Sequence, residues 1–174
     1  MSDYPYEKEL EEELEADMKQ IELKTMLEKA DNAVAVAVGT TAATGAIPIP
    51  FADTPLLIGQ QVALMAAISG IFGIDVKKDG LKALAITALG AGGAAVLGKT
   101  MAANLIKLIP GAGSVAGGAV SAGTAGVITW AMGKAYIEVC KAVKMGKLSE
   151  NDITGLKGSA LFKDYFEVQM KNRE

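Results

Sequence analysis

The feature that most constrains the fold of this chain is an apolar middle region made almost entirely of small side chains. Hydrophobic residues make up 51% of the 174 positions, yet aromatic residues make up only 5%, and 20 positions are glycine. Small side chains fill little volume, so a core built from them requires helix backbones that pack close together. Glycine costs a helix about 1 kcal/mol against alanine, and that packing has to offset the cost. The sequence therefore predicts an all-α fold, a Gly/Ala-rich helical bundle in one domain.

Prolines, glycines and polar interruptions divide the chain into predicted helices. Residues 7–30 have strong helix composition, and a run from residue 33 ends at two prolines. Further helices are expected to start at Asp53 or Thr54, at Leu81 after a capping Asp79, at Ser114 and at Ile153 after a Ser149–Asp152 capping box. We expect two long helical hairpins at residues 33–146, between an acidic amphipathic helix at 1–32 and a short C-terminal helical tail at 147–174.

Several residues are candidates for structural or interaction roles in this bundle. Proline removes a backbone donor and restricts the residue before it, so prolines mark the corners between helices. Glycines at helical spacing let neighbouring helices approach closely. On these grounds we single out Pro48, Pro50, Pro110, Gly113 and Gly117. Asp53 joins them as a helix cap, and Phe51 as the apolar residue of the same turn.

The first 30 residues carry two apolar stripes on nearly opposite sides of the predicted helix. The first stripe consists of Leu10, Leu14, Met18 and Ile21; the second consists of Leu23, Met26, Leu27 and Ala30. Three interpretations remain open: a break near residue 22, a first half that folds over another part of the same core, or an acidic half that packs on a second chain.

The same segment is strongly acidic. Residues 1–20 hold eight acids and two lysines, so their net charge is 2 − 8 = −6, whereas the whole chain has a net charge of −3.

Composition argues against several classes of function. No basic stripe with interleaved aromatic residues is present, so nucleic-acid binding is not expected. Histidine is absent and Cys140 is the only cysteine, so neither a metal site nor a nucleophilic triad is expected, and we predict a buried structural thiol. The acidic start does not resemble a secretory signal, which favours a cytoplasmic protein. We therefore expect no enzyme, no catalytic residue and no cofactor.

One motif opposes that expectation. Gly93, Gly98, Lys99 and Thr100 match the phosphate-binding pattern GxxxxGK[ST]. Such a loop requires a strand before it and an acidic residue on a later strand to hold Mg²⁺, and the next acid along this chain is Glu138. We interpret the match as accidental, and a nucleotide-binding enzyme remains the second alternative function.

Two stretches without charged residues, 54–74 and 108–133, are long enough to cross a bilayer. Gln60, Gln61, Pro110 and the many glycines favour buried helices of a soluble or peripheral protein instead. Integral membrane insertion, or membrane remodelling, is therefore kept as the first alternative function.

Short motifs across residues 33–140 resemble a known family. They are IPIPFAD at 47–53, QVALM at 61–65, IFGI at 71–74, GK at 98–99, LIPGAG at 108–113, TAG at 124–126 and GKAYI at 133–137. These resemble the uncharacterised helical domain that follows the GTPase domain in bacterial Era-like GTPases, with a related domain in YcjF-type membrane proteins. Here the acidic helix takes the place of the GTPase domain, as in a stand-alone copy. The resemblance implies a helical module associated with GTPases and with the inner face of the cell membrane, which binds a GTPase or another protein partner and forms homo-oligomers.

Overall fold

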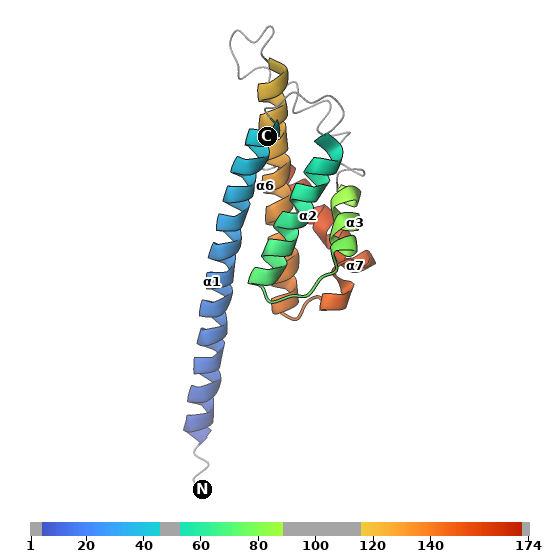
Figure 1. Cartoon of the computed structure of the whole chain (residues 1–174). Helices are drawn as coiled ribbons and strands as arrows, with labels where there is room; N and C mark the ends of the chain where they lie inside the picture. Colours follow the sequence, from blue (N-terminus) through green and yellow to red (C-terminus); the bar gives the residue numbers. More distant parts are fainter. Residues whose placement is uncertain (1–4, 46–52, 89–115, 172–174) are drawn as a thin grey trace.

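The computed structural model describes residues 5–45, 53–88 and 116–171 (Figure 1). The regular secondary structure within these ranges is helical throughout and includes no strand, which confirms the predicted all-α class. The α-helices are α1 (Pro5–Gly45), α2 (Asp53–Ile71), α3 (Lys78–Ala88), α6 (Ala116–Lys144) and α7 (Leu156–Lys171), and a 3₁₀ turn, η3 (Glu150–Asp152), precedes α7. Helix α1 packs against α6 and α2, while α7 packs against α6 and α3, so the helices form a bundle.

Helix α1 is one continuous element of 41 residues, about 60 Å long at 1.5 Å per residue. The predicted break near residue 22 is therefore wrong, and the N-terminal helix continues past residue 32, where it was expected to end. Residues 31–45 stay helical although they include Gly39 and two threonines whose hydroxyls bond to carbonyls four residues earlier, Thr40 to Val36 at 3.1 Å and Thr41 to Ala37 at 2.7 Å. Contacts with α6 supply the stabilisation that local composition lacks.

Two predicted capping residues take other positions in the structure. Helix α3 begins at Lys78, so Asp79 lies in its first turn, where its carboxylate interacts favourably with the positive end of the helix dipole. The Ser149 hydroxyl donates to the Asp152 carboxylate at 2.9 Å and makes no hydrogen bond to the backbone. The predicted capping box is therefore absent, and η3 delays the start of the last helix from Ile153 to Leu156.

The core is centred on α6, which lies behind α1 and α2 in Figure 1. Tyr136 of α6 is fully buried; its ring meets that of Phe162 in α7 edge to face, with centroids 6.2 Å apart, and its hydroxyl lies 2.8 Å from the Ser69 hydroxyl in α2. A second buried polar pair joins the same two helices, because the Gln61 amide donates to the Thr129 hydroxyl at 2.8 Å. These polar contacts fix the register of α2 on α6.

Close approach of α1, α2 and α6 occurs at Gly133. A Cβ atom at this position would lie 2.5 Å from Cγ2 of Val34 and 3.2 Å from Cδ2 of Leu64. On the same helix, a Cβ at Gly126 would meet Val38 and Ala42 at ordinary contact distances of 3.6 and 3.8 Å. The bundle thus uses a glycine for close helix packing, as the composition indicates, and among the described glycines Gly133 makes the tightest contact between two helices.

Candidate interaction surface

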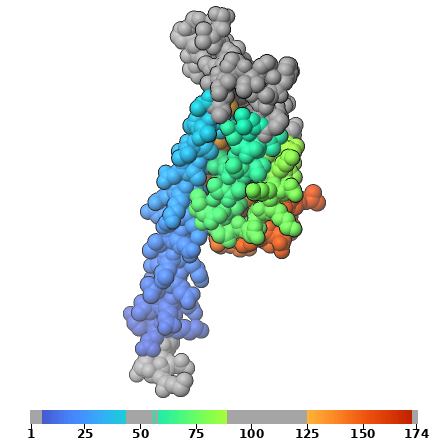
Figure 2. Space-filling model, viewed as in Figure 1, coloured from blue at the N-terminus to red at the C-terminus, as the bar shows by residue number. Residues whose placement is uncertain are grey.

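The first half of α1 extends past the end of the bundle. In Figures 1 and 2 residues near the N-terminus run clear of the other described elements, whereas the second half of the helix lies along α6. We call residues 5–21 the arm. Of the alternatives open for this segment, folding over another part of the same core is therefore wrong.

The four residues of the first predicted stripe are exposed along the arm. Their relative exposures are 55% for Leu10, 61% for Leu14, 63% for Met18 and 66% for Ile21. Their spacing of 4, 4 and 3 residues spans 11 residues, or about three helical turns, so the stripe runs nearly straight along the helix. Four large apolar side chains in a row on solvent-exposed helix are typical of an interaction surface.

The second stripe lies on the other side of α1 and holds the helix to the bundle. Ala30 and Val34 are buried in the core, and Leu23, Met26 and Leu27 pack against it. At about 100° per residue the two stripes are centred roughly 180° apart. A partner on the arm's stripe would therefore approach from the side of α1 that faces away from the bundle.

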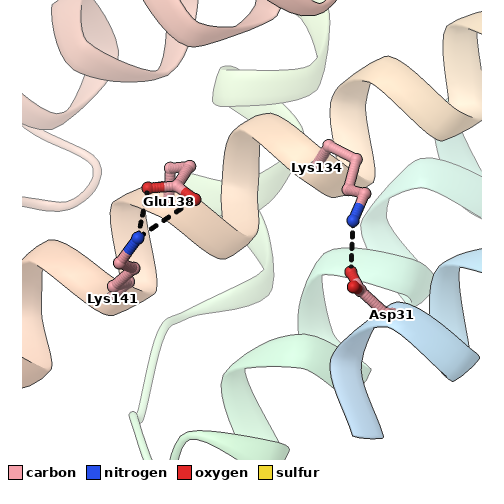
Figure 3. A network of polar contacts seen from close by, with 4 residues as sticks. All are labelled: Asp31, Lys134, Glu138 and Lys141. Atoms are coloured by element: carbon pink, nitrogen blue, oxygen red, sulfur yellow. Dashed lines mark hydrogen bonds and ion pairs between the residues drawn. The ribbon is translucent and has the colours of Figure 1, made fainter. Parts of the chain in front are cut away.

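One ion pair joins α1 to α6, and a second lies within α6 (Figure 3). The Lys134 ammonium lies 2.7 Å from the Asp31 carboxylate across the two helices, and Lys141 lies 3.2 Å from Glu138 within α6. The Asp31–Lys134 pair follows directly after the buried Ala30 of the second stripe. The buried second stripe sets the rotation of α1 that points the arm's apolar stripe away from the bundle, and the ion pair adds a partly exposed contact to it.

The lysines of the arm lie away from its apolar stripe. Lys8 pairs with Glu12 at 3.9 Å and Lys19 with Glu15 at 3.6 Å, all four with mostly exposed side chains. By the helical rotation of about 100° per residue, both lysines lie on the side opposite the stripe, while Glu11 borders it on one edge and Glu13 and Asp17 on the other. The stripe is thus flanked by carboxylates.

An open groove of about 400 Å³ lies where the arm leaves the bundle. It is on the bundle side of α1, so it is separate from the exposed stripe. The residues that line it are Lys19, Gln20, Glu22, Leu23, Met26, Lys144 and Met145.

The only thiol of the chain is buried in α6, as predicted. Cys140 is fully inaccessible, and burial raises its pKa from 9.0 to about 12, with a smaller opposing effect from a hydrogen bond with Tyr136. Burial also raises the pKa of Tyr136, and the neighbouring Cys140 adds to that rise. Both groups therefore remain neutral at physiological pH and serve as core side chains.

Several predicted residues fall outside the described ranges. These are Gly93, Gly98, Lys99 and Thr100 of the phosphate-loop match, together with Pro48, Pro50, Phe51, Pro110 and Gly113. Asp53 begins α2 and Gly117 lies in the first turn of α6, and the surroundings of both residues are also outside the description. In residues 5–45, 53–88 and 116–171, no three His, Cys, Asp or Glu side chains gather where they could hold a metal ion. In the same part of the chain, every helix is too short or too polar to cross a membrane.

Comparison with known families gives one match. The sequence matches DUF697, described as a domain of unknown function, over residues 6–161. The chain belongs to the DUF697 family. No curated protein and no solved structure matches it. The match confirms the resemblance to the helical domain of YcjF-like, GTPase-associated proteins, and it extends beyond residues 33–140 to include the arm and the start of α7.

Some features of this DUF697 domain were missed by reasoning from sequence. The net charge predicted for this segment includes Glu11, Glu13 and Asp17, but their positions at the edges of the stripe were not predicted. Their spacing from Leu14 on a helix of 3.6 residues per turn is enough to place them there. The contact of Gly133 with Val34 and Leu64 has no sequence signal, because glycine recurs throughout the region. The groove beside Met145 also depends on where α6 ends relative to α1.

Proposed function

We propose that this DUF697 domain is a non-enzymatic helical binding module that docks onto a GTPase or another protein partner. The observation that carries the proposal is the exposed stripe of the arm, because a soluble helix that needed no partner would present polar residues there. The occurrence of the domain in YcjF-like, GTPase-associated proteins supports a GTPase as that partner.

The proposal also includes the cellular location of the module and its self-association. It locates the module in the cytoplasm or peripherally at the inner face of the cell membrane, and it includes self-association into a homo-oligomer. The family resemblance supports both parts. They are tested by the sedimentation and vesicle-binding behaviour of the full chain without detergent.

Site-specific photo-cross-linking in cells tests the partner. A photoreactive phenylalanine analogue is introduced at Leu14 in the stripe or, as the control, at Ile86, which is 47% exposed on α3. We expect position 14 to cross-link a GTPase, identified by mass spectrometry, and position 86 to yield much less of the same product.

Other outcomes would contradict the proposal. If positions 14 and 86 gave equal yields of cross-linked GTPase, the stripe would not be the surface that docks the GTPase. Cross-links from position 14 to lipid alone would indicate a membrane-binding helix instead, and an absence of any protein cross-link at position 14 would remove the evidence for a protein-binding module.

A further inference from the structure

The charge pattern of the arm restricts what can cover its stripe. Residues 5–21 contain seven acids and two lysines, so the arm's charge is 2 − 7 = −5. The two lysines pair with Glu12 and Glu15 on the side away from the stripe. A helix lying along Leu10, Leu14, Met18 and Ile21 would therefore face carboxylates along both of its own edges.

We infer that the arm binds an amphipathic helix of a partner protein whose apolar stripe is bordered by Lys or Arg. The inference rests on the proposed function and names the chemistry of the partner. Charges at the edges of a helix–helix seam decide which helices pair, because opposite charges attract there and like charges repel.

The same pattern disfavours two other occupants. A second copy of this arm would place its own acidic edges, which hold Glu11, Glu13 and Asp17, against those of the first copy in either orientation, so like charges would lie together. A membrane with anionic lipids would repel a helix whose apolar face is bordered by acids, since helices that lie on such membranes carry Lys and Arg there.

The geometry of the stripe also restricts the partner. A spacing of 4, 4 and 3 residues averages about 3.67 residues per turn, so over three turns the apolar line drifts only slightly, in the sense of a right-handed supercoil, whereas a seven-residue repeat drifts in the left-handed sense. The stripe covers only 11 residues, so about three turns of partner helix suffice to bury it. The partner helix should therefore carry apolar residues at the same spacing.

A designed peptide pair provides the test. Both peptides are helices of about 20 residues, long enough to form in water, with Leu at the 4, 4, 3 spacing; one has Lys and Arg beside the stripe and the other has Glu. Binding of each fluorescent peptide to the full chain is measured by anisotropy at low and high salt. The variants are Leu14→Gln with Met18→Gln in the stripe and Ile86→Gln as the matched exposed control.

We expect the basic peptide to bind and the acidic peptide not to bind. The stripe variant should weaken binding by at least about tenfold, while Ile86→Gln leaves the dissociation constant unchanged. High salt should also weaken binding of the basic peptide to the parent chain, because the charges at the edges of the stripe are exposed and salt screens them. A charge-reversed arm, with Glu11→Lys, Glu13→Lys and Asp17→Lys, should exchange the preference and bind the acidic peptide.

Four results would overturn the inference. These are equal binding of both peptides, undiminished binding by the stripe variant, a Leu14-dependent dimer of the chain alone, and Leu14-dependent binding to vesicles of phosphatidylcholine and phosphatidylserine. If the peptides fail while position 14 still cross-links a GTPase in cells, only the predicted chemistry of the partner helix is wrong. If both experiments fail, the proposed function fails as well.

Discussion

Replacement of Gly133 by alanine tests the close packing of α1, α2 and α6. The added Cβ would lie 2.5 and 3.1 Å from the two γ-carbons of Val34 and 3.2 Å from Leu64. Valine in a helix has one strongly preferred side-chain rotamer, so Val34 cannot rotate away at low cost. Either the side chain leaves its rotamer or the two helices separate.

The expected magnitude is the sum of two opposing effects. Alanine stabilises the interior of a helix by about 1 kcal/mol relative to glycine, and an extra methyl group in a packed core costs about 1–3 kcal/mol. Gly133→Ala should therefore lower the free energy of unfolding by up to about 2 kcal/mol. Gly126→Ala on the same face of α6 meets only ordinary contacts at 3.6 Å or more, so it should raise the free energy of unfolding by up to about 1 kcal/mol.

Urea unfolding followed by far-ultraviolet circular dichroism measures both variants against the parent chain. A double variant with Val34→Ala relieves the clash, so Gly133→Ala should cost less in that background, with a coupling of about 0.5–3 kcal/mol. The reasoning is refuted if Gly133→Ala stabilises the protein as much as Gly126→Ala does, or if the coupling with Val34 is absent.

Three further predictions concern the core, an ion pair and the phosphate-loop match. Because the folded protein holds the Cys140 proton to about pH 12 while the unfolded chain releases it near pH 9.0, the free energy of unfolding should fall as pH rises between these values, by up to about 1.4 kcal/mol per pH unit. Urea unfolding of Cys140→Ala should show a shallower fall over this range, and an unchanged slope would contradict the prediction. Asp31→Asn removes a partly exposed pair with Lys134 and should cost at most about 1 kcal/mol, less at high salt; a larger loss in urea unfolding would show that the pair does more than orient α1. Direct binding measurements with ATP and GTP should give equal, negligible binding for the parent chain and Lys99→Ala, and binding that depends on Lys99 would establish a nucleotide site.

Much of the fold follows from local sequence, with clear physical limits. The Glu, Lys, Leu and Met composition of residues 7–30 predicts a helix, and the structure confirms it. The continuation to Gly45 could not be predicted, because Gly39, Thr40 and Thr41 are weak helix formers and their helical state depends on contacts with α6. The predicted capping box at Ser149 failed because its hydroxyl bonds to the Asp152 side chain instead of the backbone.

The candidate interaction surface was predicted in part. Helical periodicity places Leu10, Leu14, Met18 and Ile21 on one line opposite the second stripe, and the structure confirms this arrangement. Whether this stripe is exposed to solvent or buried in the core depends on how far the bundle extends along α1. The end of α6 near Met145 sets that limit, and the sequence of α1 itself does not. The alternatives of folding back or facing a second chain could therefore be separated only by the structure.

The central claim is that the fold leaves the acidic, apolar-striped arm uncovered and available to a partner. Amide hydrogen exchange of the purified full chain, resolved by residue, tests it most directly. Amides of residues 7–21 should exchange much faster than those of residues 26–41, since the second set is packed on α6 and opens only with the bundle. Equal, slow exchange in both sets would show that the arm is already covered in the isolated protein, and it would contradict the account.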